Sequence, residues 1–325
     1  MSLSSSRPAA ISVAIAMTAP KPPVFLIAGP TASGKSALAL ALAEQIGGVI
    51  VNADSAQLYR DLPVLSAGPT AMERQRAEHR LYGELDGANA CSAAEWAAIA
   101  KKEVAQLHAD GRPPVIVGGT GLYLRTLLDG IAPVPSIDPE VRREVRAASV
   151  AVNLARLRTL DPEAAERLKP TDTTRIARAL EVALSTGRSL ADWQQHREGG
   201  IAGAVDLRPL ILLPPRKWLY QRCDERLTHM IDQGAVSEVE ALLARGLDAG
   251  LPVMRAIGVR EIAAYLRGET TLDEAISAAQ QATRRYAKRQ YTWFAHQPPP
   301  DWPRFREALD VEVLADALAL LNPKG

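Results

Sequence analysis

The sequence predicts an α/β protein whose core is a parallel sheet flanked by helices, with an all-helical domain inserted into that core. Three observations lead to this prediction. Short apolar runs of strand length alternate with helical patterns between residues 24 and 128, which is typical of a parallel sheet. A proline-rich joint at 132–139 and a purely helical block up to about residue 200 then follow. A further apolar run at 210–214 indicates that the sheet resumes there, so the block is an insertion.

The first apolar run leads directly into a loop that fits the pattern G-x-x-x-x-G-K-[ST] at every fixed position. The run is VFLIA at 24–28, and a helical pattern begins straight after the loop. Backbone N–H groups of such a loop bind the oxygens of a di- or triphosphate, its lysine adds positive charge, and its final hydroxyl suits Mg²⁺. We therefore predict a P-loop NTPase-like core with a di- or triphosphate site at Gly29, Pro30, Thr31, Ala32, Ser33, Gly34, Lys35 and Ser36. Ser36 is the predicted magnesium ligand, and Mg²⁺ is the expected cofactor.

The remaining elements are predicted in chain order from apolar runs, capping residues and breaks. A second strand at 49–53 ends in Asp54-Ser55-Ala56-Gln57, and a third at 115–117 ends in Gly118-Gly119-Thr120-Gly121. Because the carboxyl ends of parallel strands line the ligand crevice, both polar segments are candidate site loops. Helices are predicted at 92–108, 122–128, 216–233, 236–245, 258–267 and 272–293.

These elements divide the chain into four parts. We expect a disordered N-terminal extension at 1–22, a core domain formed by 23–135 and 205–300, a helical insertion at 136–204 and a C-terminal tail at 301–325. The insertion carries an excess of arginine, but glutamates are interleaved with it. On the residues alone, a solvated face and an anion-binding surface both fit this pattern.

Composition limits the classes of partner and compartment. The formal net charge is +1, so no global field attracts nucleic acid and any basic surface must be local. The two cysteines, Cys91 and Cys223, lie far apart without a CxxC partner, which disfavours a zinc site or a disulfide framework. No apolar run approaches membrane-spanning length. We expect a cytoplasmic, monomeric protein without membrane contact.

The strand ends indicate how the phosphate site is used. An ordinary P-loop ATPase has a strand that ends in an acidic residue beside the loop, to hold Mg²⁺ and position water. Here the third strand ends in glycines and Thr120, so the site looks built to hold a phosphate chain without hydrolysing it. A diphosphate then fits the role of leaving group, with Asp54 as general base and Thr120 fixing a nucleophile. Asp54 is alternatively an N-cap or a Mg²⁺ partner, and Thr120 a helix N-cap.

Seven blocks of the sequence, in consistent order over roughly residues 24–295, together resemble the tRNA dimethylallyltransferase family. The blocks are GPTASGKS, VNADSAQLY, VIVGGTGLYLRTLLDG, IDPEVR, TTRIARALEV, RAIGVRE and AKRQYTWF. The resemblance implies transfer of a dimethylallyl group from dimethylallyl diphosphate to N6 of adenosine 37, next to the anticodon of tRNA. It also implies that the insertion binds the tRNA anticodon stem-loop, which favours a functional role for its arginines.

The resemblance also assigns residues. It implies that Asp54 is the base, that Thr120 is the hydrogen-bonding residue and that Arg260 is a further diphosphate contact. The tRNA-binding residues that it implies are Asp54, Ser55, Ala56, Gln57, Thr120, Arg142, Thr174, Arg175, Ile176, Ala177, Arg178 and Arg255. Segment 65–70 departs from the family pattern, because it lacks a lysine that many members have there, and it receives no role.

Three other functions remain open on the sequence. An adenylate isopentenyltransferase that acts on free nucleotides would share the P-loop, Asp54 and Thr120, but it has less need of a basic insertion. A P-loop small-molecule kinase is disfavoured by the missing acidic strand end. A non-catalytic, nucleotide-dependent RNA-binding protein has no need of Asp54 and Thr120 facing the phosphate loop.

Overall fold

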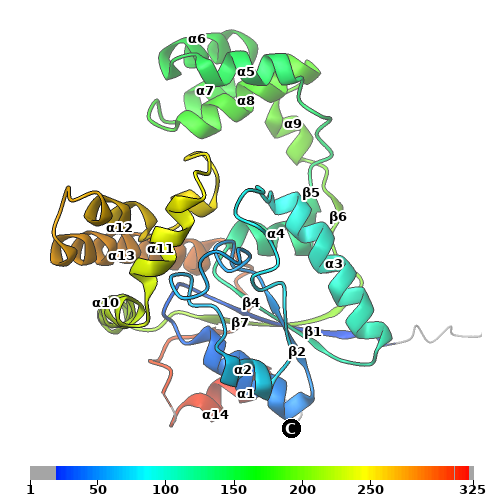
Figure 1. Ribbon diagram of the computed structural model, residues 1–325. Helices are drawn as coiled ribbons and strands as arrows, with labels where there is room; N and C mark the ends of the chain where they lie inside the picture. Colours follow the sequence, from blue (N-terminus) through cyan, green and yellow to red (C-terminus); the bar gives the residue numbers. More distant parts are fainter. Residues whose placement is uncertain (1–19, 311, 322–325) are drawn as a thin grey trace, which may run out of the picture.

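One parallel sheet forms the centre of the protein, as the computed structural model of residues 20–310 and 312–321 shows (Figure 1). The strands are β1 (Pro23–Ala28), β2 (Val49–Asn52), β3 (His79–Arg80), β4 (Pro114–Gly118), β7 (Asp206–Leu212) and β8 (Arg304–Phe305). They form a six-stranded sheet in the order β3-β2-β4-β1-β7-β8, in which neighbours run parallel. The predicted fold class is confirmed. Residues 1–19 of the predicted disordered extension lie outside the described residues.

Helices cover both faces of the sheet. Their bounds are α1 (Lys35–Ile46), α2 (Ala71–Arg76), α3 (Ala93–Ala109), α4 (Gly121–Asp129), α10 (Arg216–Asp232), α11 (Ala235–Ala244), α12 (Val259–Leu266), α13 (Leu272–His296) and α14 (Leu314–Leu321), with the 3₁₀ turn η1 (Val253–Arg255). α1, α2 and α14 lie on one face, α3 and α4 lie on the other, and α10 to α13 form a group beside them (Figure 1). Within residues 20–310 and 312–321, no helix combines the length and the apolar character needed to cross a membrane.

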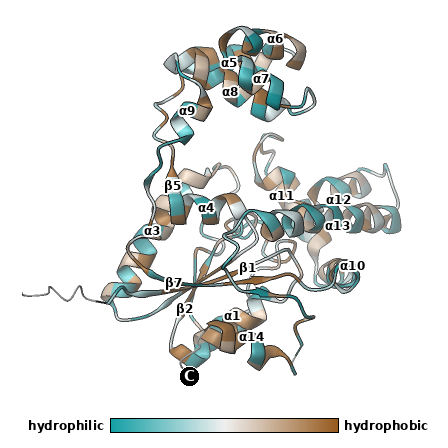
Figure 2. Cartoon of the chain, turned by 180° about the vertical axis from the view of Figure 1, so that it is seen from behind, coloured by the Kyte–Doolittle hydropathy of each residue, from teal (hydrophilic) through white to brown (hydrophobic). Residues whose placement is uncertain are grey.

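β1 lies in the middle of the sheet and is buried on both faces. Successive side chains of a strand point to opposite faces. Leu26 therefore belongs to the apolar cluster that contains Trp96 and Leu127 of α3 and α4, whereas Phe25 belongs to the cluster that contains Leu38 of α1. A strand covered on both sides needs an apolar residue at every position rather than an alternating pattern. Figure 2 shows this concentration of apolar residues in the strands.

A helical unit interrupts the core between α4 and β7. It consists of α5 (Pro139–Ala147), α6 (Val150–Leu160), α7 (Pro162–Arg167), α8 (Thr173–Thr186) and α9 (Leu190–Gln194). The antiparallel pair of β5 (Gly130–Ile131) and β6 (Glu198–Gly199) joins it to the core and forms a neck. The unit has its own apolar core, and it stands away from the sheet beyond the neck in both views (Figures 1 and 2).

The C-terminal segment is part of the core, although the sequence suggested a tail from residue 301. β8 pairs with β7, and Ala317 and Leu321 of α14 are buried in the same cluster as α1. Leu309 lies against the loop after β1, because a Cβ atom on Gly34 would be 2.8 Å from its Cδ2 atom. The physical reason is the apolar face of α14, which removes one side of α1 from solvent.

One buried carboxylate lies among the arginines of the helical unit. Glu181 on α8 is 1% exposed and accepts a hydrogen bond of 2.5 Å from Arg146 Nε. Arg178 Nη1 lies 3.9 Å from the other carboxylate oxygen. Burial lowers the pKa of Arg178, the charge of Glu181 raises it, and the positive charges of Arg142 and Arg146 lower it. Glu181 is therefore a shared counter-charge for this cluster.

Replacing Glu181 by glutamine is expected to lower the free energy of unfolding by roughly 1–3 kcal/mol, because the cluster loses a buried counter-charge. The matched control is Glu140→Gln in the same unit. Glu140 and its partner Arg143 have side chains that are 71% and 70% exposed, and such surface pairs contribute about 0–1 kcal/mol. Urea denaturation followed by circular dichroism measures both variants, and equal effects would contradict the role of Glu181.

Candidate active site

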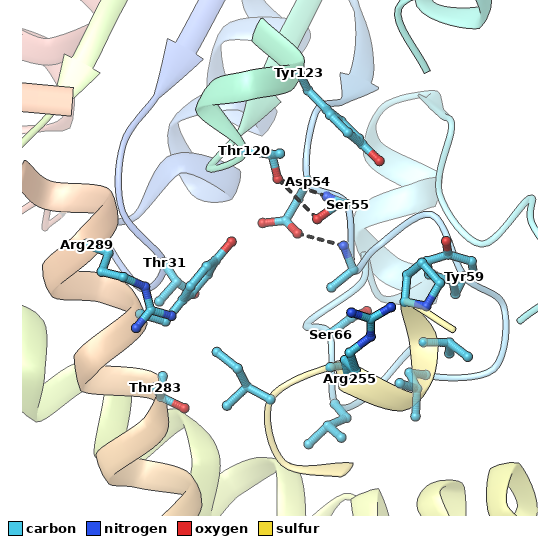
Figure 3. A pocket seen from close by; sticks show the side chains of 18 of the residues that line it. Thr31, Asp54, Ser55, Tyr59, Ser66, Thr120, Tyr123, Arg255, Thr283 and Arg289 are labelled. Atoms are coloured by element: carbon cyan, nitrogen blue, oxygen red, sulfur yellow. Dashed lines mark hydrogen bonds between the residues drawn. The ribbon is translucent and has the colours of Figure 1, made fainter. Parts of the chain in front are cut away.

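A cavity of about 530 Å³ lies at the carboxyl ends of β1, β2 and β4. Thr31, Asp54 and Thr120, from the loops that follow these strands, line one wall. The opposite wall comes from α10, η1 and α13, so residues far apart in the sequence meet there (Figure 3). This is the edge at which open parallel sheets bind ligands. The three loops singled out in the sequence therefore face one cavity.

The loop after β1 has the geometry of an anion site. Gly29 has a φ of 153°, and a Cβ atom there would lie 2.5 Å from the carbonyl oxygen of Leu212, so only glycine fits. Gly34 precedes α1, whose first N–H groups have no partner inside the helix. The Ser33 hydroxyl is buried and lacks a hydrogen-bond partner among the described residues. An unpartnered hydroxyl at a helix N-terminus is suited to an anionic ligand oxygen.

Two cations lie beside this loop. Lys35 Nζ donates a hydrogen bond of 2.6 Å to the carbonyl oxygen of Pro30. Burial lowers the pKa of Lys35 to about 8, although the nearby carboxylate of Asp54 raises it. Arg226 on α10 donates to the Thr31 hydroxyl, and burial lowers its pKa as well. Two partly desolvated positive charges beside an amide-rich loop form a site for a polyvalent anion such as a diphosphate.

The sequence suggested Arg260, rather than Arg226, as the arginine next to the diphosphate. Arg260 is exposed in the first turn of α12 and does not line the cavity. The helix turns it outward, because Val259 and Ile262 occupy the buried positions. The geometry therefore replaces Arg260 by Arg226. The sequence signal is helical spacing: Arg226 lies three residues after Cys223 and four before Met230, which are both on the buried side of α10.

Hydrogen bonds within its own loop fix both the backbone and the side chain of Asp54. Asn52, fully buried at the end of β2, accepts a hydrogen bond of 2.7 Å from Asp54 N and donates one of 3.0 Å to Asp54 O. Asp54 Oδ1 accepts a hydrogen bond of 3.0 Å from Ala56 N, and the other carboxylate oxygen points into the cavity (Figure 3). No helix begins at Asp54, which excludes the N-cap alternative. A carboxylate with one anchored oxygen and one oxygen facing a ligand is suited to accept a proton.

The side chain of Thr120 lines the cavity and does not cap a helix. Thr120 occupies the N-cap position of α4, but its hydroxyl makes no capping hydrogen bond to that helix, so the side chain does not serve as a cap. Its Oγ1 accepts a hydrogen bond of 3.0 Å from Ser55 N, and it also interacts with the hydroxyl of Tyr286 on α13. Burial raises the pKa of Tyr286, so that phenol stays protonated. Thr120 and Asp54 therefore share one corner of the cavity (Figure 3).

The residues after Asp54 divide between the cavity and its support. Ser55 and Ala56 line the cavity. Gln57 instead donates hydrogen bonds from Nε2 to the carbonyl oxygens of Ser66, at 3.0 Å, and Ala67, at 2.6 Å. Its side chain therefore supports a neighbouring loop, and the tRNA contact assigned to Gln57 from the sequence stays a prediction. Segment 65–70, which received no role, brings Ser66 to the cavity wall.

Part of the cavity lining is an apolar wall. It is formed by Leu62, Leu65, Leu227, Met230 and Val253. Arg255 of η1 also lines the cavity, is exposed and donates to the carbonyl oxygen of Gly250 (Figure 3). The cavity thus combines two residues beside the anion loop, Thr31 and Arg226, with a carboxylate and with apolar side chains suited to a short hydrocarbon group.

The tRNA contacts assigned to the helical unit lie outside this cavity. The polar ones are exposed or half-buried, namely Arg142, Thr174, Arg175 and Arg178. Ile176 and Ala177 are 0% and 6% exposed and belong to the apolar core of the unit. Because α8 turns these two side chains inward, a contact there falls to the backbone, and the assignment of both residues as tRNA contacts stays a prediction.

Magnesium fits the phosphate loop only together with a phosphate ligand. Across 20–310 and 312–321, no group of three or more His, Cys, Asp or Glu side chains could hold a metal ion. Ser36 is exposed in the first turn of α1. Mg²⁺ keeps several waters and is commonly bound by one or two protein oxygens plus substrate phosphates. A hydroxyl is the protein ligand that this loop offers.

Comparison with known proteins assigns the family. The IPP transferase family model matches residues 57–297, which is more than half of the chain. The chain belongs to the IPP transferase family. The resemblance noted in the sequence is therefore confirmed.

Named IPP transferases are similar to the chain over most of its length. The tRNA dimethylallyltransferase of Sphingopyxis alaskensis is 64% identical over 296 residues, which is 91% of this chain and 96% of the relative. The tRNA dimethylallyltransferase of Erythrobacter litoralis is 62% identical over 298 residues, or 90% and 94% of the two chains. Among solved structures, the tRNA isopentenylpyrophosphate transferase of Bacillus halodurans matches with a TM-score of 0.67 at 30% identity, covering 94% of this chain and 98% of that one. A eukaryotic dimethylallyltransferase acting on tRNA matches with a TM-score of 0.74 at 26% identity, covering 84% and 69%.

Binding of inorganic pyrophosphate is expected to weaken as the pH rises through about 8, because Lys35 of the free protein then loses its proton and its attraction for the anion. Isothermal titration calorimetry on either side of this pH measures the effect. Lys35→Met is the control. Ionisation of pyrophosphate affects binding to both proteins equally, but the variant lacks the amine that titrates. Identical pH profiles for the two proteins would contradict the role of Lys35.

Proposed function

We propose that the protein is a tRNA dimethylallyltransferase, which transfers a dimethylallyl group from dimethylallyl diphosphate to N6 of adenosine 37, next to the anticodon of tRNA. One observation carries the proposal: Thr31 of the diphosphate loop, Arg226, an apolar wall and the pair of Asp54 and Thr120 line a single cavity. Relatives named for this activity match most of the chain, which supports the same conclusion. The products are isopentenyladenosine and diphosphate.

The acceptor amine needs a base. The lone pair on N6 of adenine is delocalised into the ring, so the amine is a weak nucleophile until a proton is removed. As the N6 lone pair forms the bond to the allylic carbon, the cavity-facing oxygen of Asp54 takes one N6 proton. Thr120 orients the amine by a hydrogen bond, and its own hydroxyl is fixed by Ser55 and Tyr286. These contacts support assigning both residues to the acceptor side.

The leaving group needs positive charge. When the allylic C–O bond breaks, its electron pair goes to the diphosphate oxygen, so negative charge grows at the loop after β1. Lys35, Arg226 and the N–H groups at the start of α1 are already arranged around that position, so little reorganisation is needed. Bound Mg²⁺, with Ser36 among its ligands, would neutralise part of the diphosphate charge.

The tRNA substrate accounts for the helical unit. Adenosine 37 must leave the base stack to enter a cavity of this kind, and the rest of the anticodon arm then needs a separate support. The unit offers exposed Arg175 and the arginines around Glu181. Arginine contacts of this type go mainly to phosphates, so they position the RNA without reading its sequence. A tRNA substrate also assigns the activity to the cytoplasm.

The proposed function is tested by incubating the purified protein and Mg²⁺ with labelled dimethylallyl diphosphate and either unmodified tRNA or free AMP. We expect label on an adenine of the anticodon loop and none on AMP. Label on AMP would move the assignment to the free-nucleotide enzymes. Label on neither, with tRNA still bound, would leave a non-catalytic RNA-binding protein.

Asp54→Asn is expected to lower kcat by about 10²–10⁴-fold, because the amide keeps the hydrogen bond to Ala56 but cannot accept the N6 proton. The Kd for tRNA is expected to stay at the wild-type value. Asp110→Asn is the control, since Asp110 is exposed at the end of α3. Single-turnover assays and filter binding measure both quantities, and unchanged turnover would remove Asp54 as the base.

Arg175→Ala is expected to weaken tRNA binding and to reduce the slope of log Kd against log salt concentration by about 1, as loss of one phosphate contact requires. Arg267→Ala is the control, because Arg267 is also exposed and pairs with Glu269, as Arg175 pairs with Asp172, but it lies outside the helical unit. Fluorescence anisotropy at several salt concentrations gives both slopes. A wild-type slope for Arg175→Ala would rule out a phosphate contact there.

A further inference from the structure

Gln290 of α13 joins the loop after β1 to the loop after β4. In the proposed reaction the first loop binds the leaving group and the second contacts the acceptor. Its side chain is 6% exposed. Oε1 accepts a hydrogen bond of 2.8 Å from Thr31 N, in the diphosphate loop. Nε2 donates a hydrogen bond of 2.8 Å to the carbonyl oxygen of Gly119, directly before Thr120. One planar amide therefore spans the leaving-group side and the acceptor side of the cavity.

The loop after β4 is shaped to receive α13. A Cβ atom on Gly119 would lie 2.3 Å from Nε2 of Gln290, and one on Gly121 would lie 2.6 Å from the ring of Trp293. The glycines on either side of Thr120 thus allow the helix to pack directly on the loop backbone. α13 also supplies Tyr286, which interacts with Thr120, so one rigid helix contacts the loop at several points.

We propose that Gln290 is a positioning residue that fixes the distance between the diphosphate loop and the corner formed by Asp54 and Thr120. The inference rests on the proposed function. Alkyl transfer requires the N6 nitrogen, the allylic carbon and the leaving oxygen in line, with reacting atoms about 3–3.5 Å apart. The loop after β1 holds the leaving group and the loop after β4 holds the acceptor. Any shift between the two loops therefore changes the reacting distance directly.

Only an amide satisfies both contacts of Gln290 at neutral pH. Thr31 N requires an acceptor, and the Gly119 carbonyl requires a donor. A carboxylate offers acceptors alone and is repelled by the Gly119 oxygen. A protonated carboxyl group regains the missing donor. The charge state of a glutamate at this position thus controls whether the two loops are joined.

The test is Gln290→Glu, assayed for dimethylallyl transfer to tRNA across a range of pH. At the alkaline end we expect kcat to fall by about 10²-fold, as a misplacement of about 1 Å costs. The KM for dimethylallyl diphosphate and the Kd for tRNA are expected to stay near wild-type values, because each loop still binds its own ligand. The ratio of variant to wild-type kcat is expected to rise as the pH falls and the new carboxyl group takes up its proton.

Gln280→Glu is the matched control on the same helix. Gln280 lies ten residues earlier, about 15 Å along α13, and donates to Asp224 O and Thr228 Oγ1 of α10. Its ratio to wild-type kcat is expected to be independent of pH. Gln290→Asn is a second variant, whose shorter amide reaches one loop only, so we expect a low kcat without pH dependence. Thermal unfolding and tRNA binding confirm that each variant is folded.

Each outcome decides between the two proposals. A Gln290→Glu ratio that rises toward acid pH, with KM and tRNA binding preserved, supports the positioning role. A pH-independent ratio, a loss confined to KM, or wild-type kcat in folded Gln290→Asn would overturn that role while leaving the proposed function intact. Absence of transfer by the wild-type protein would overturn the proposed function and this role together.

Discussion

Direct backbone contact between the strand ends is the constraint on which the site depends. A Cβ atom on Gly29 would lie 2.5 Å from the carbonyl oxygen of Leu212, and one on Gly118 would lie 2.1 Å from that of Ala53. The segments at the ends of β1, β2, β4 and β7 therefore touch without side chains between them. Their spacing follows from the register of the sheet. The pairing of the buried strands therefore sets the distances between the loop after β1, Asp54 and Thr120.

Sequence reasoning identified the parts of the site that lie at strand ends. GPTASGKS, NADS and GGTG are short segments whose chemistry depends on local framing by a strand and a helix. The fold class could be predicted for a related reason, because a strand buried on both faces is an apolar run that stands out from its surroundings. Features that depend on residues close together in the chain could therefore be predicted from the sequence.

Contacts supplied by distant helices could not be predicted in this way. Arg226 and Gln290 are two of many polar residues at helical spacing in α10 and α13, and only tertiary packing decides which of them faces the loops. Arg260 is the converse case, since a motif position suggested a contact that the phase of α12 turns outward. β8 has two residues and gives no periodic pattern, so the C-terminal segment could be recognised as core only after folding.

The neck has a consequence for how the two tasks of the chain are combined. Gly130 pairs with Gly199, so the helical unit leaves the core and returns to it at one point. For the core, the whole insertion is equivalent to the closing turn of a short antiparallel hairpin, and the entropy of closing such a loop grows only slowly with its length. An insertion of another size or surface would leave the strand ends that form the cavity unchanged. The proposed RNA-binding surface of the helical unit and the candidate active site are therefore structurally separate, and evolution or design can exchange the unit without rebuilding the cavity.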